Sequence, residues 1–184
     1  ILIHNRENLV VIDEAYVDFG AESVVSFIER YDNLMVVQTL SKSRSLAGAR
    51  VGIAMGNEKL IADMNRIKFS FNPYNLNRLS ILAGAEAMKD RRYFEETRRK
   101  IMDTREEFVK DMESLGFRIL PSKANFVFAS SHAISGEEYF DRLRKYNIIV
   151  RHFKDKKICN YVRITIGTPE EMNVLVQATR KILG

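Results

Sequence analysis

The sequence predicts an α/β chain in two parts, a parallel-type sheet with helices followed by a small α+β unit. Three short apolar runs, at residues 8–13, 34–40 and 50–55, have the length and composition of strands, and a helix-like stripe separates the first two. Strands that alternate with helices are typical of α/β folds, whose ligands bind at the carboxyl ends of the strands. Short strands and two capping motifs then mark the last third as a different unit.

The first part supplies the strands of the predicted sheet. The run Asn8–Asp13 ends in a carboxylate and predicts a buried parallel strand. Residues 22–31 place their apolar side chains on one side of a predicted helix. Asn57 is suited to cap a helix that continues to about Ile67, and the Asn-Pro-Tyr-Asn stretch at 72–75 ends it.

Two further helices lead out of this part. Residues 77–89 are rich in Ala, Leu and Met, and residues 91–115 carry one apolar residue every seven positions along a charged helix. The basic run at 98–100 is matched by nearby glutamates, so we interpret it as a solvated helix surface and not as a nucleic-acid patch. Gly116 ends the helix, and we place the boundary between the two parts near residue 90.

The last third predicts a compact α+β unit. Ser135 and Thr168 each have a glutamate three residues later, which is the capping-box pattern at the start of a helix. Pro169 occupies the first position of the second of these helices, where proline is favoured. The predicted strands are residues 117–120, 125–129, 148–151 and 161–166.

Composition excludes several classes of protein. The chain has 184 residues, 46% of them hydrophobic, so it can bury a core, and its single Cys rules out a disulfide scaffold or a Cys-rich zinc module. No apolar run approaches the roughly 18–20 residues that a membrane span needs. We therefore expect a cytoplasmic protein without a membrane, nucleic-acid or metal partner. Because Ile1 is not an initiator Met and strand-like sequence follows at once, we also expect a piece of a longer protein.

Two carboxylates end the first predicted strand, in the sequence Val10-Val-Ile-Asp-Glu14. The magnesium-binding strand of a P-loop ATPase has the same pattern. That class needs a Gly-rich loop that ends in Lys and Ser or Thr, which this chain lacks and which would normally lie upstream. The plain alternative is an acid that caps a helix, so this pattern alone leaves the function open.

The stretch after the second predicted strand is more specific. Ser41 and Lys42 are followed, eight residues after the lysine, by Arg50, with glycine in between. Serine and arginine together suit a phosphate dianion, and a partly desolvated lysine is a nucleophilic amine. The alternative is a surface turn with solvated basic residues.

Together, Asp13-Glu-Ala-Tyr16 and Ser41-Lys-Ser-Arg-Ser-Leu-Ala-Gly-Ala-Arg50 resemble the cofactor site of the fold-type I pyridoxal-phosphate enzymes. Further motifs are similar to the histidinol-phosphate aminotransferase branch, and the resemblance covers essentially the whole chain in order. It implies that residues 1–90 are the carboxyl-terminal part of the cofactor-binding large domain and residues 91–184 the small carboxyl-terminal domain. The further motifs are Asn72-Pro-Tyr-Asn-Leu-Asn77, Ser122-Lys-Ala-Asn-Phe126, Ile148-Ile-Val-Arg151 and Val162-Arg-Ile-Thr-Ile-Gly-Thr168.

The resemblance implies a role for each cofactor residue around pyridoxal 5'-phosphate. Lys42 would bond to the cofactor aldehyde and, once released, move the substrate proton. Asp13 would pair with the ring nitrogen, and Tyr16 would hydrogen-bond the ring hydroxyl. Ser41 and Arg50 would hold the cofactor phosphate.

Two arginines resemble substrate-binding residues. Arg163 resembles the arginine that grips the substrate α-carboxylate, and Arg151 resembles the one that meets the distal phosphate of the substrate. Arg163 lies on an apolar run, where a charge must find a partner, so a structural ion pair is the alternative. Arg151 stands beside His152 and Lys154, so an exposed basic loop is its alternative.

The resemblance implies amino transfer between L-histidinol phosphate and 2-oxoglutarate, in histidine biosynthesis, by an enzyme that is a homodimer at full length. Two alternatives of the same superfamily stay open, an aminotransferase of other specificity and a phosphate-ester decarboxylase. A third is the aminotransferase-fold ligand-sensing domain of a transcription regulator, which would need an upstream helix-turn-helix. About half of the expected site would precede Ile1, so we expect this chain alone to be inactive or weak.

Overall fold

The computed structural model describes residues 1–184, which divide into two compact units, unit 1 at residues 1–96 and unit 2 at residues 97–184. The division falls within helix α3 (Arg91–Ser114), whereas the sequence placed a boundary near residue 90. None of the helices is both long and apolar enough to cross a membrane.

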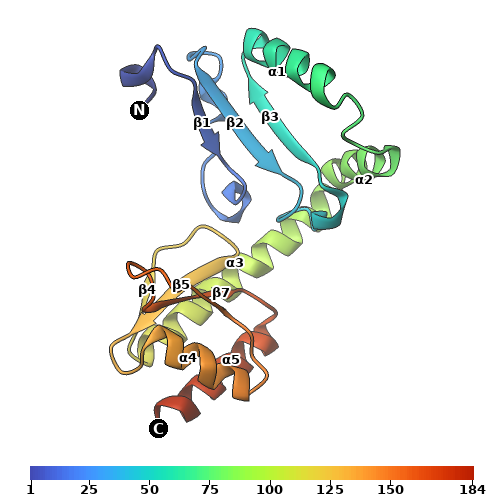
Figure 1. The fold of residues 1–184 in the computed structure, drawn as a ribbon. Helices are drawn as coiled ribbons and strands as arrows, with labels where there is room; N and C mark the ends of the chain where they lie inside the picture. Colours follow the sequence, from blue (N-terminus) through green and yellow to red (C-terminus); the bar gives the residue numbers. More distant parts are fainter. The chain divides into compact units, whose positions relative to one another are not determined.

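Unit 1 is built on a three-stranded sheet with the order β1-β2-β3 (Figure 1). β1 (Val10–Asp13) and β2 (Leu34–Thr39) are parallel, as predicted, whereas β3 (Gly52–Gly56) is antiparallel to β2. The direction of β3 follows from its connection, since residues 40–51 contain no crossover helix. The prediction that β1 is buried is wrong: Val11 is 51% exposed, because no helix packs extensively against β1.

The helix predicted over residues 22–31 is also wrong. The segment contains only a three-residue 3₁₀ turn, η3 (Val25–Phe27). The Ser23 hydroxyl and the Val24 N–H both donate to the Glu14 carboxylate, at 2.7 and 2.6 Å. These two bonds hold the backbone in turns at the point where a helix would begin.

Helices α1 (Glu58–Phe71) and α2 (Arg78–Lys89) complete unit 1. The predicted cap at Asn57 is confirmed, since its side chain accepts from the Leu60 N–H, and Asn77 caps α2 in the same way. No residue of α1 is buried. The large apolar side chains that stay more than half exposed on α1, on α2 and between them include Ile67, Phe69, Phe71, Tyr74, Leu79, Ile81 and Leu82.

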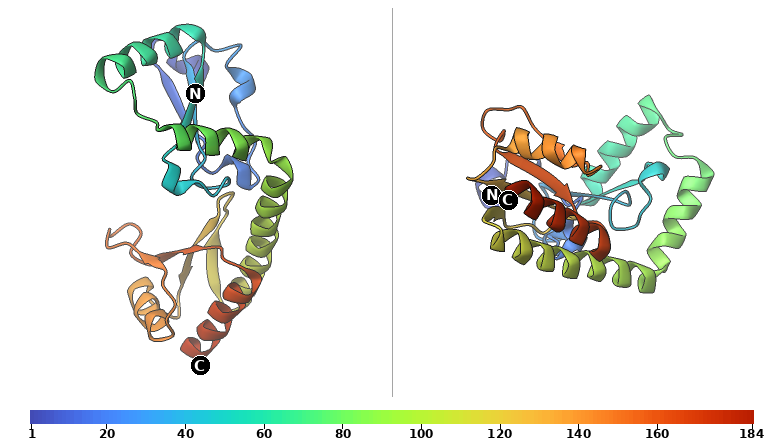
Figure 2. Two further views of the ribbon diagram at one scale, coloured as in Figure 1. Left: turned by 90° about the vertical axis from the view of Figure 1, so that its right-hand side faces the viewer. Right: turned by 90° about the horizontal axis from the view of Figure 1, so that it is seen from below.

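Unit 2 contains an antiparallel sheet with the order β4-β5-β7-β6 (Figure 1). Helices α4 (Gly136–Lys145) and α5 (Pro169–Leu183) lie side by side (Figures 1 and 2). Gly116 follows α3 in the left-handed conformation, with φ of 80°, as expected for a helix end. The strands are β4 (Phe117–Leu120), β5 (Phe126–Ser131), β6 (Arg151–His152) and β7 (Tyr161–Thr165).

One face of this sheet packs against the helices of unit 2. Along β5, Val127 and Ala129 are fully buried, and along β7 the same holds for Val162 and Ile164. Because side chains alternate across a strand, Arg163 lies on the other face of the sheet. The helices complete the core with Phe108 and Met112 from α3, Tyr139 and Leu143 from α4, and Met172, Leu175, Val176 and Ile182 from α5.

Local hydrogen bonds define the ends of the helices in unit 2. The Ser135 side chain accepts from the Glu138 N–H, and the predicted capping box of Thr168 and Glu171 has both of its bonds. The capping motifs therefore begin α4 and α5 where the sequence predicted.

The strand predicted at 148–151 is shorter than expected. β6 contains only Arg151 and His152, because the chain leaves α4 through Asn147 with φ of 58°. The Ile148 N–H donates to the Leu143 carbonyl at 3.1 Å, so this residue closes the helix end and does not join the sheet.

Candidate active site

The loop of residues 40–51 joins β2 to β3 and carries three of the residues that the sequence singled out. The Leu40 N–H donates to the Val51 carbonyl at 3.1 Å, which extends the β2–β3 ladder by one residue. Ser41 and Arg50 are therefore the next residues on either side of the base of the loop. A short 3₁₀ turn, η4 (Ala47–Ala49), occupies the return.

Arg50 adopts the left-handed backbone conformation, with φ of 56°. A non-glycine residue in this region is strained, and such strain is common at ligand sites. One nitrogen of its guanidinium donates to the Ala47 carbonyl at 3.0 Å. Across the loop, the Ser41 hydroxyl accepts from the Thr39 hydroxyl at 2.9 Å. The base of the loop thus presents a hydroxyl and an exposed guanidinium.

Lys42, Tyr16 and Asp13 lie at the same edge of the sheet. The Lys42 ammonium is 5.5 Å from the centre of the Tyr16 ring. Asp13 ends β1 and is paired in register with Val37 of the parallel strand β2. An Asp13 carboxylate oxygen accepts from the Ala15 N–H at 2.9 Å. An amine, a phenol and a carboxylate therefore all lie near the carboxyl ends of two parallel strands, where α/β folds bind ligands.

Glu14, which the sequence did not single out as a site residue, holds this edge together. Its side chain is only 7% exposed and accepts a third hydrogen bond, from the Gln38 amide on β2 at 2.8 Å. Glu14 thereby ties the segment that contains Tyr16 to the neighbouring strand. The sequence contained a signal for this role. Side chains alternate along a strand, so of the two consecutive acids at its end only one points to the exposed side.

In unit 2, Arg151 and Arg163 stand directly opposite one another on β6 and β7. Directly opposed residues share a sheet face, where like charges destabilise the pair. Arg163 stacks over Phe126, 5.3 Å from its ring centre, and Arg151 stacks over Phe153 at 5.4 Å. The Arg163 Nε is buried and makes no hydrogen bond. Two opposed cations with an unused donor are a candidate site for an anion.

The predicted site residues thus form two groups. Unit 1 places the amine, the phenol and the carboxylate near the strand ends, and the hydroxyl and the guanidinium at the base of the loop after β2. Unit 2 pairs the two predicted substrate arginines. Within unit 2 the neighbours of Arg163 are an aromatic ring and another arginine, and its role stays a prediction.

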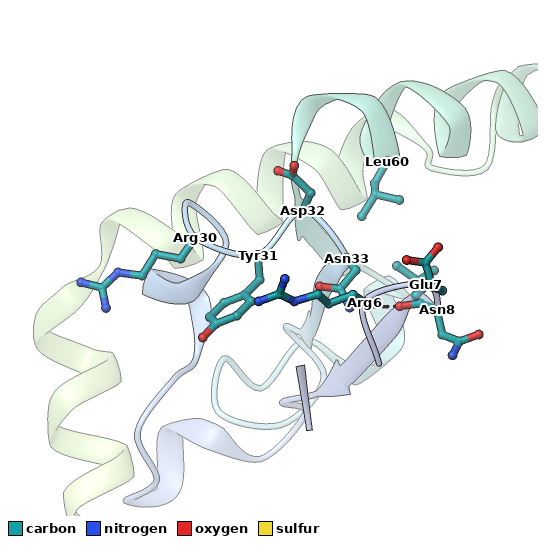
Figure 3. A pocket seen from close by; sticks show the side chains of 9 residues that line it. Arg6, Glu7, Asn8, Arg30, Tyr31, Asp32, Asn33 and Leu60 are labelled. Carbon is teal, nitrogen blue, oxygen red and sulfur yellow. Dashed lines mark hydrogen bonds between the residues drawn. The ribbon is translucent and has the colours of Figure 1, made fainter. Parts of the chain in front are cut away.

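A cavity of about 610 Å³ opens at the other end of the unit 1 strands (Figure 3). It is lined by residues just before β1, among them Leu9, and just before β2, among them Asn33. Asp13 is the last residue of β1 and Lys42 follows β2, both at the opposite ends of these strands, so this cavity is not part of the candidate active site.

The solved structures that share this fold include aminotransferases and decarboxylases. The chain is similar to the histidinol-phosphate aminotransferase of Clostridium acetobutylicum, with 28% identity and a TM-score of 0.89 over 99% of this chain and 56% of that one. It is also similar to the enzyme of that name from Sinorhizobium meliloti, solved in complex with pyridoxal-5'-phosphate, with 25% identity and a TM-score of 0.83. That match covers 96% of this chain and 50% of the other.

Residues 1–178 match the family described as aminotransferase class I and II, and the chain belongs to that family. A histidinol-phosphate aminotransferase from Brachyspira hyodysenteriae is 51% identical to it over all 184 residues. The match covers 52% of that relative, so the chain spans about half the length of the curated relatives it matches.

Proposed function

We propose that the full-length protein containing this chain transfers an amino group between L-histidinol phosphate and 2-oxoglutarate. The observation that carries the proposal is the 51% identity to a histidinol-phosphate aminotransferase over the whole chain. The cluster of Lys42, Tyr16 and Asp13 at one sheet edge supports it, because amino transfer needs an amine that moves a proton beside groups that hold a cofactor ring.

The residues of unit 1 suit pyridoxal phosphate by their chemistry. The cofactor has an aldehyde, a ring nitrogen, a ring hydroxyl and a phosphate, and the site offers an amine, a carboxylate, a phenol, a hydroxyl and a guanidinium. Arg50 is held in a strained conformation beside the base of the loop, which is consistent with a residue kept in place for an anion. The residues that would hold the cofactor are Asp13, Tyr16, Ser41, Lys42 and Arg50.

When bound, the cofactor supplies a ring that withdraws electrons from the substrate Cα. Asp13 would keep the ring nitrogen protonated, because a carboxylate favours the charged form of a neighbouring base. Tyr16 would donate a hydrogen bond from its hydroxyl to the ring oxygen. Lys42 would move the proton between the substrate Cα and the cofactor carbon that carries the aldehyde, a role that contributes typically 10²–10⁴-fold to a rate.

The arginine pair of unit 2 suits the anionic groups of the two substrates. The oxo acid carries an α-carboxylate and the amino donor carries a phosphate ester, and both are anions that guanidinium groups bind with paired hydrogen bonds. Arg163 would bind the carboxylate and Arg151 the phosphate. An anion between them would also relieve the repulsion of the opposed cations.

The first test is a covalent adduct at Lys42 in the full-length protein. Pyridoxal phosphate is added, the absorbance spectrum is recorded, and borohydride reduction is followed by peptide mapping. We expect a band near the visible edge and a reduced adduct at Lys42. Lys42→Ala should abolish the band and the adduct and lower the rate of amino transfer by roughly 10²–10⁴-fold. Lys59 is an exposed lysine of α1, and Lys59→Ala should leave the band, the adduct and the rate unchanged.

Absence of the adduct in the full-length protein would overturn the proposal and favour a ligand-sensing domain. Products separate the remaining alternatives, since a decarboxylase releases carbon dioxide and an aminotransferase converts 2-oxoglutarate to glutamate. Residues 1–184 alone should transaminate weakly or not at all, because small errors in the position of catalytic groups are costly. Turnover by this chain at a rate typical of enzymes would contradict that expectation.

We also propose that the full-length protein is a homodimer, as the resemblance to this superfamily implies. The exposed apolar side chains of unit 1 support an extensive contact between two copies of the chain, since Phe71 is 90% and Tyr74 91% exposed. Soluble monomers rarely leave such side chains clustered on their surface. Light scattering of the full-length protein at micromolar concentration should give twice the mass of one chain, and the mass of a monomer would refute the proposal.

Finally, we propose a cytoplasmic location. Cys159, the single cysteine, is free, and free thiols are typical of reducing compartments. Fractionation of cells that carry the tagged full-length protein tests this, and recovery in a secreted fraction would contradict it.

A further inference from the structure

The two residues after Lys42 are anchored to distant parts of unit 1. Ser43 is 6% exposed, and its hydroxyl donates a hydrogen bond to the Asp18 carboxylate. Asp18 lies in the 3₁₀ turn η2 (Val17–Phe19), which directly follows Tyr16. This bond therefore joins the loop that carries the amine to the segment that carries the phenol.

The Arg44 side chain makes the second anchor, on the end of α2 and the start of α3. Its guanidinium carbon lies 3.5 Å from the centre of the Phe94 ring, and one of its nitrogens donates to the Ala87 carbonyl at 2.9 Å. Ala87 is in the last turn of α2, where carbonyls lack donors within the helix and a cation is favoured. A planar cation on an aromatic face is a contact that lysine does not reproduce.

The charges around Arg44 favour the bound position of its guanidinium. Burial lowers the pKa of Arg44, and the nearby carboxylates of Asp18, Glu95 and Asp90 oppose that shift. Arg91 is a neighbouring cation and, like burial, lowers the pKa of Arg44. Arginine stays charged in proteins, so the stacked cation persists at neutral pH.

We propose that Arg44 is a positioning residue for Lys42, and this inference rests on the proposed function. Lys42 has a flexible side chain on an exposed loop, yet its ammonium must reach a fixed point beside Tyr16. Arg44 fixes the backbone two residues away by holding the loop on α2 and on Phe94. The Ser45 N–H bond to the Lys42 carbonyl, at 3.2 Å, then transmits that position to the lysine itself.

The test compares Arg44→Met with Arg66→Met in the full-length protein. Methionine keeps the length of the side chain but loses the charge and the hydrogen bond. Arg66 is a matched control, because its side chain is 80% exposed and pairs only with the exposed Asp63. Three quantities are measured: amide hydrogen exchange of peptide 40–51 without cofactor, the pH titration of the visible band with cofactor, and kcat against KM for 2-oxoglutarate.

We expect Arg44→Met to speed exchange of peptide 40–51 about tenfold or more, to shift the pH titration of the band, and to lower kcat on the order of 10- to 100-fold. KM should stay within about twofold, since the residue does not contact the substrate. Arg66→Met should match the wild type in all three. Where Arg44→Met fails to fold, Phe94→Leu serves instead, because it keeps apolar volume and removes the aromatic face.

A purely structural role would lower the melting temperature while leaving the pH titration and kcat unchanged, and that result would overturn the inference. Failure of the proposed function is a separate outcome, seen as the absence of a Lys42 adduct in the wild-type protein. A wild-type adduct together with an unaltered titration in Arg44→Met rejects the positioning role alone.

Discussion

Helix α5 of unit 2 buries six of its side chains, whereas helix α1 of unit 1 buries none. The core of unit 2 is continuous from α3 through the sheet to α5. In unit 1, aromatic and aliphatic side chains of both helices stay exposed. Unit 2 therefore has the interior of a self-contained domain, and the helices of unit 1 have faces that other protein surface can cover.

The difference extends to the candidate site. In unit 1 the chemical groups are held by hydrogen bonds among loops, through Glu14, Ser43 and Arg44. In unit 2 the two arginines lie on regular strands, and the sheet beneath them is packed against helices. We therefore expect substitutions in the core of unit 2 to affect stability most, and substitutions in the loops of unit 1 to affect chemistry most.

The largest effect on stability is expected at Gly136, the first residue of α4. A Cβ there would lie 2.5 Å from the Cys159 carbonyl oxygen and 2.8 Å from the carbonyl carbon of Asn160. Gly136→Ala should lower the free energy of unfolding of unit 2 by about 2–3 kcal/mol, because backbone must move. Gly48→Ala in unit 1 is the control, since its Cβ would meet nothing within 4 Å.

Hydrogen exchange of α5 peptides, measured against denaturant, reports the stability of unit 2. Equal stability of the Gly136→Ala and Gly48→Ala proteins would contradict the idea that unit 2 is the tightly packed one. A larger loss in Gly48→Ala would reverse the comparison.

The next effect is a loss of substrate affinity at Arg163. Arg163→Gln should raise KM for 2-oxoglutarate in the full-length protein about 10- to 100-fold, the worth of a hydrogen bond to a charged group. Stability should not fall, because the Nε of Arg163 has no hydrogen bond to lose and the opposed Arg151 is relieved of a like charge. Steady-state kinetics and thermal unfolding measure the two quantities.

Arg118→Gln, on the exposed side of β4, is the control for charge alone and should leave KM unchanged. A fall in stability with an unchanged KM would show that Arg163 serves the fold of unit 2 and not its ligand.

The two units also differ in how well the sequence predicts them. The position of α5 was predictable, because its capping box and its apolar spacing are both local signals, and both are confirmed. The direction of β3 could also have been inferred, since its connection contains no crossover helix. The turns at 22–31 could not, since they depend on contacts with residues outside the segment. The bond of Glu14 to Val24 is one such contact, and the spacing of apolar residues carries no trace of it.

The candidate site also depends on contacts that local sequence patterns do not predict. Motifs nominated Lys42 and Tyr16, and the structure brings them together, although their roles stay predictions. That Arg151 lies directly opposite Arg163 depends on strand register, which is fixed by packing across the sheet. Arg44 lies on a ring that is fifty residues further along the chain, so no local pattern could have paired them.

A smaller effect is expected at the helix caps. Thr168→Ala should lower the stability of unit 2 by about 1 kcal/mol, the usual worth of an N-cap, because α5 packs into the core and cannot fray freely. Asn77→Ala removes the cap of α2, which buries only Ser80 and Gly84, and should change global stability less. Urea unfolding followed by circular dichroism compares the two. A greater loss in Asn77→Ala would show that α2 is held as firmly as α5.

The smallest effect is a pH dependence at Tyr139, in the core of unit 2. Burial raises the pKa of Tyr139, and its hydrogen bond with the Thr179 hydroxyl, at 2.6 Å, opposes the shift. The unfolded phenol ionises near pH 10, so the folded state binds the proton more tightly than the unfolded state. The contribution of the neutral Tyr139 phenol to the stability of the folded state is therefore fully present below about pH 10 and is lost as the pH rises further.

Between pH 9 and 10.5 the wild-type protein should lose about 0.8 kcal/mol of stability that Tyr139→Phe retains. The variant is slightly less stable at neutral pH, because it lacks the bond to Thr179, while the Thr179 hydroxyl keeps its bond to the Leu175 carbonyl at 2.8 Å. Urea unfolding at the two pH values gives the difference between the proteins, in which the other tyrosines cancel. A difference that does not change with pH would mean that the interior of unit 2 admits the charged phenolate, which would contradict the tight packing of that unit.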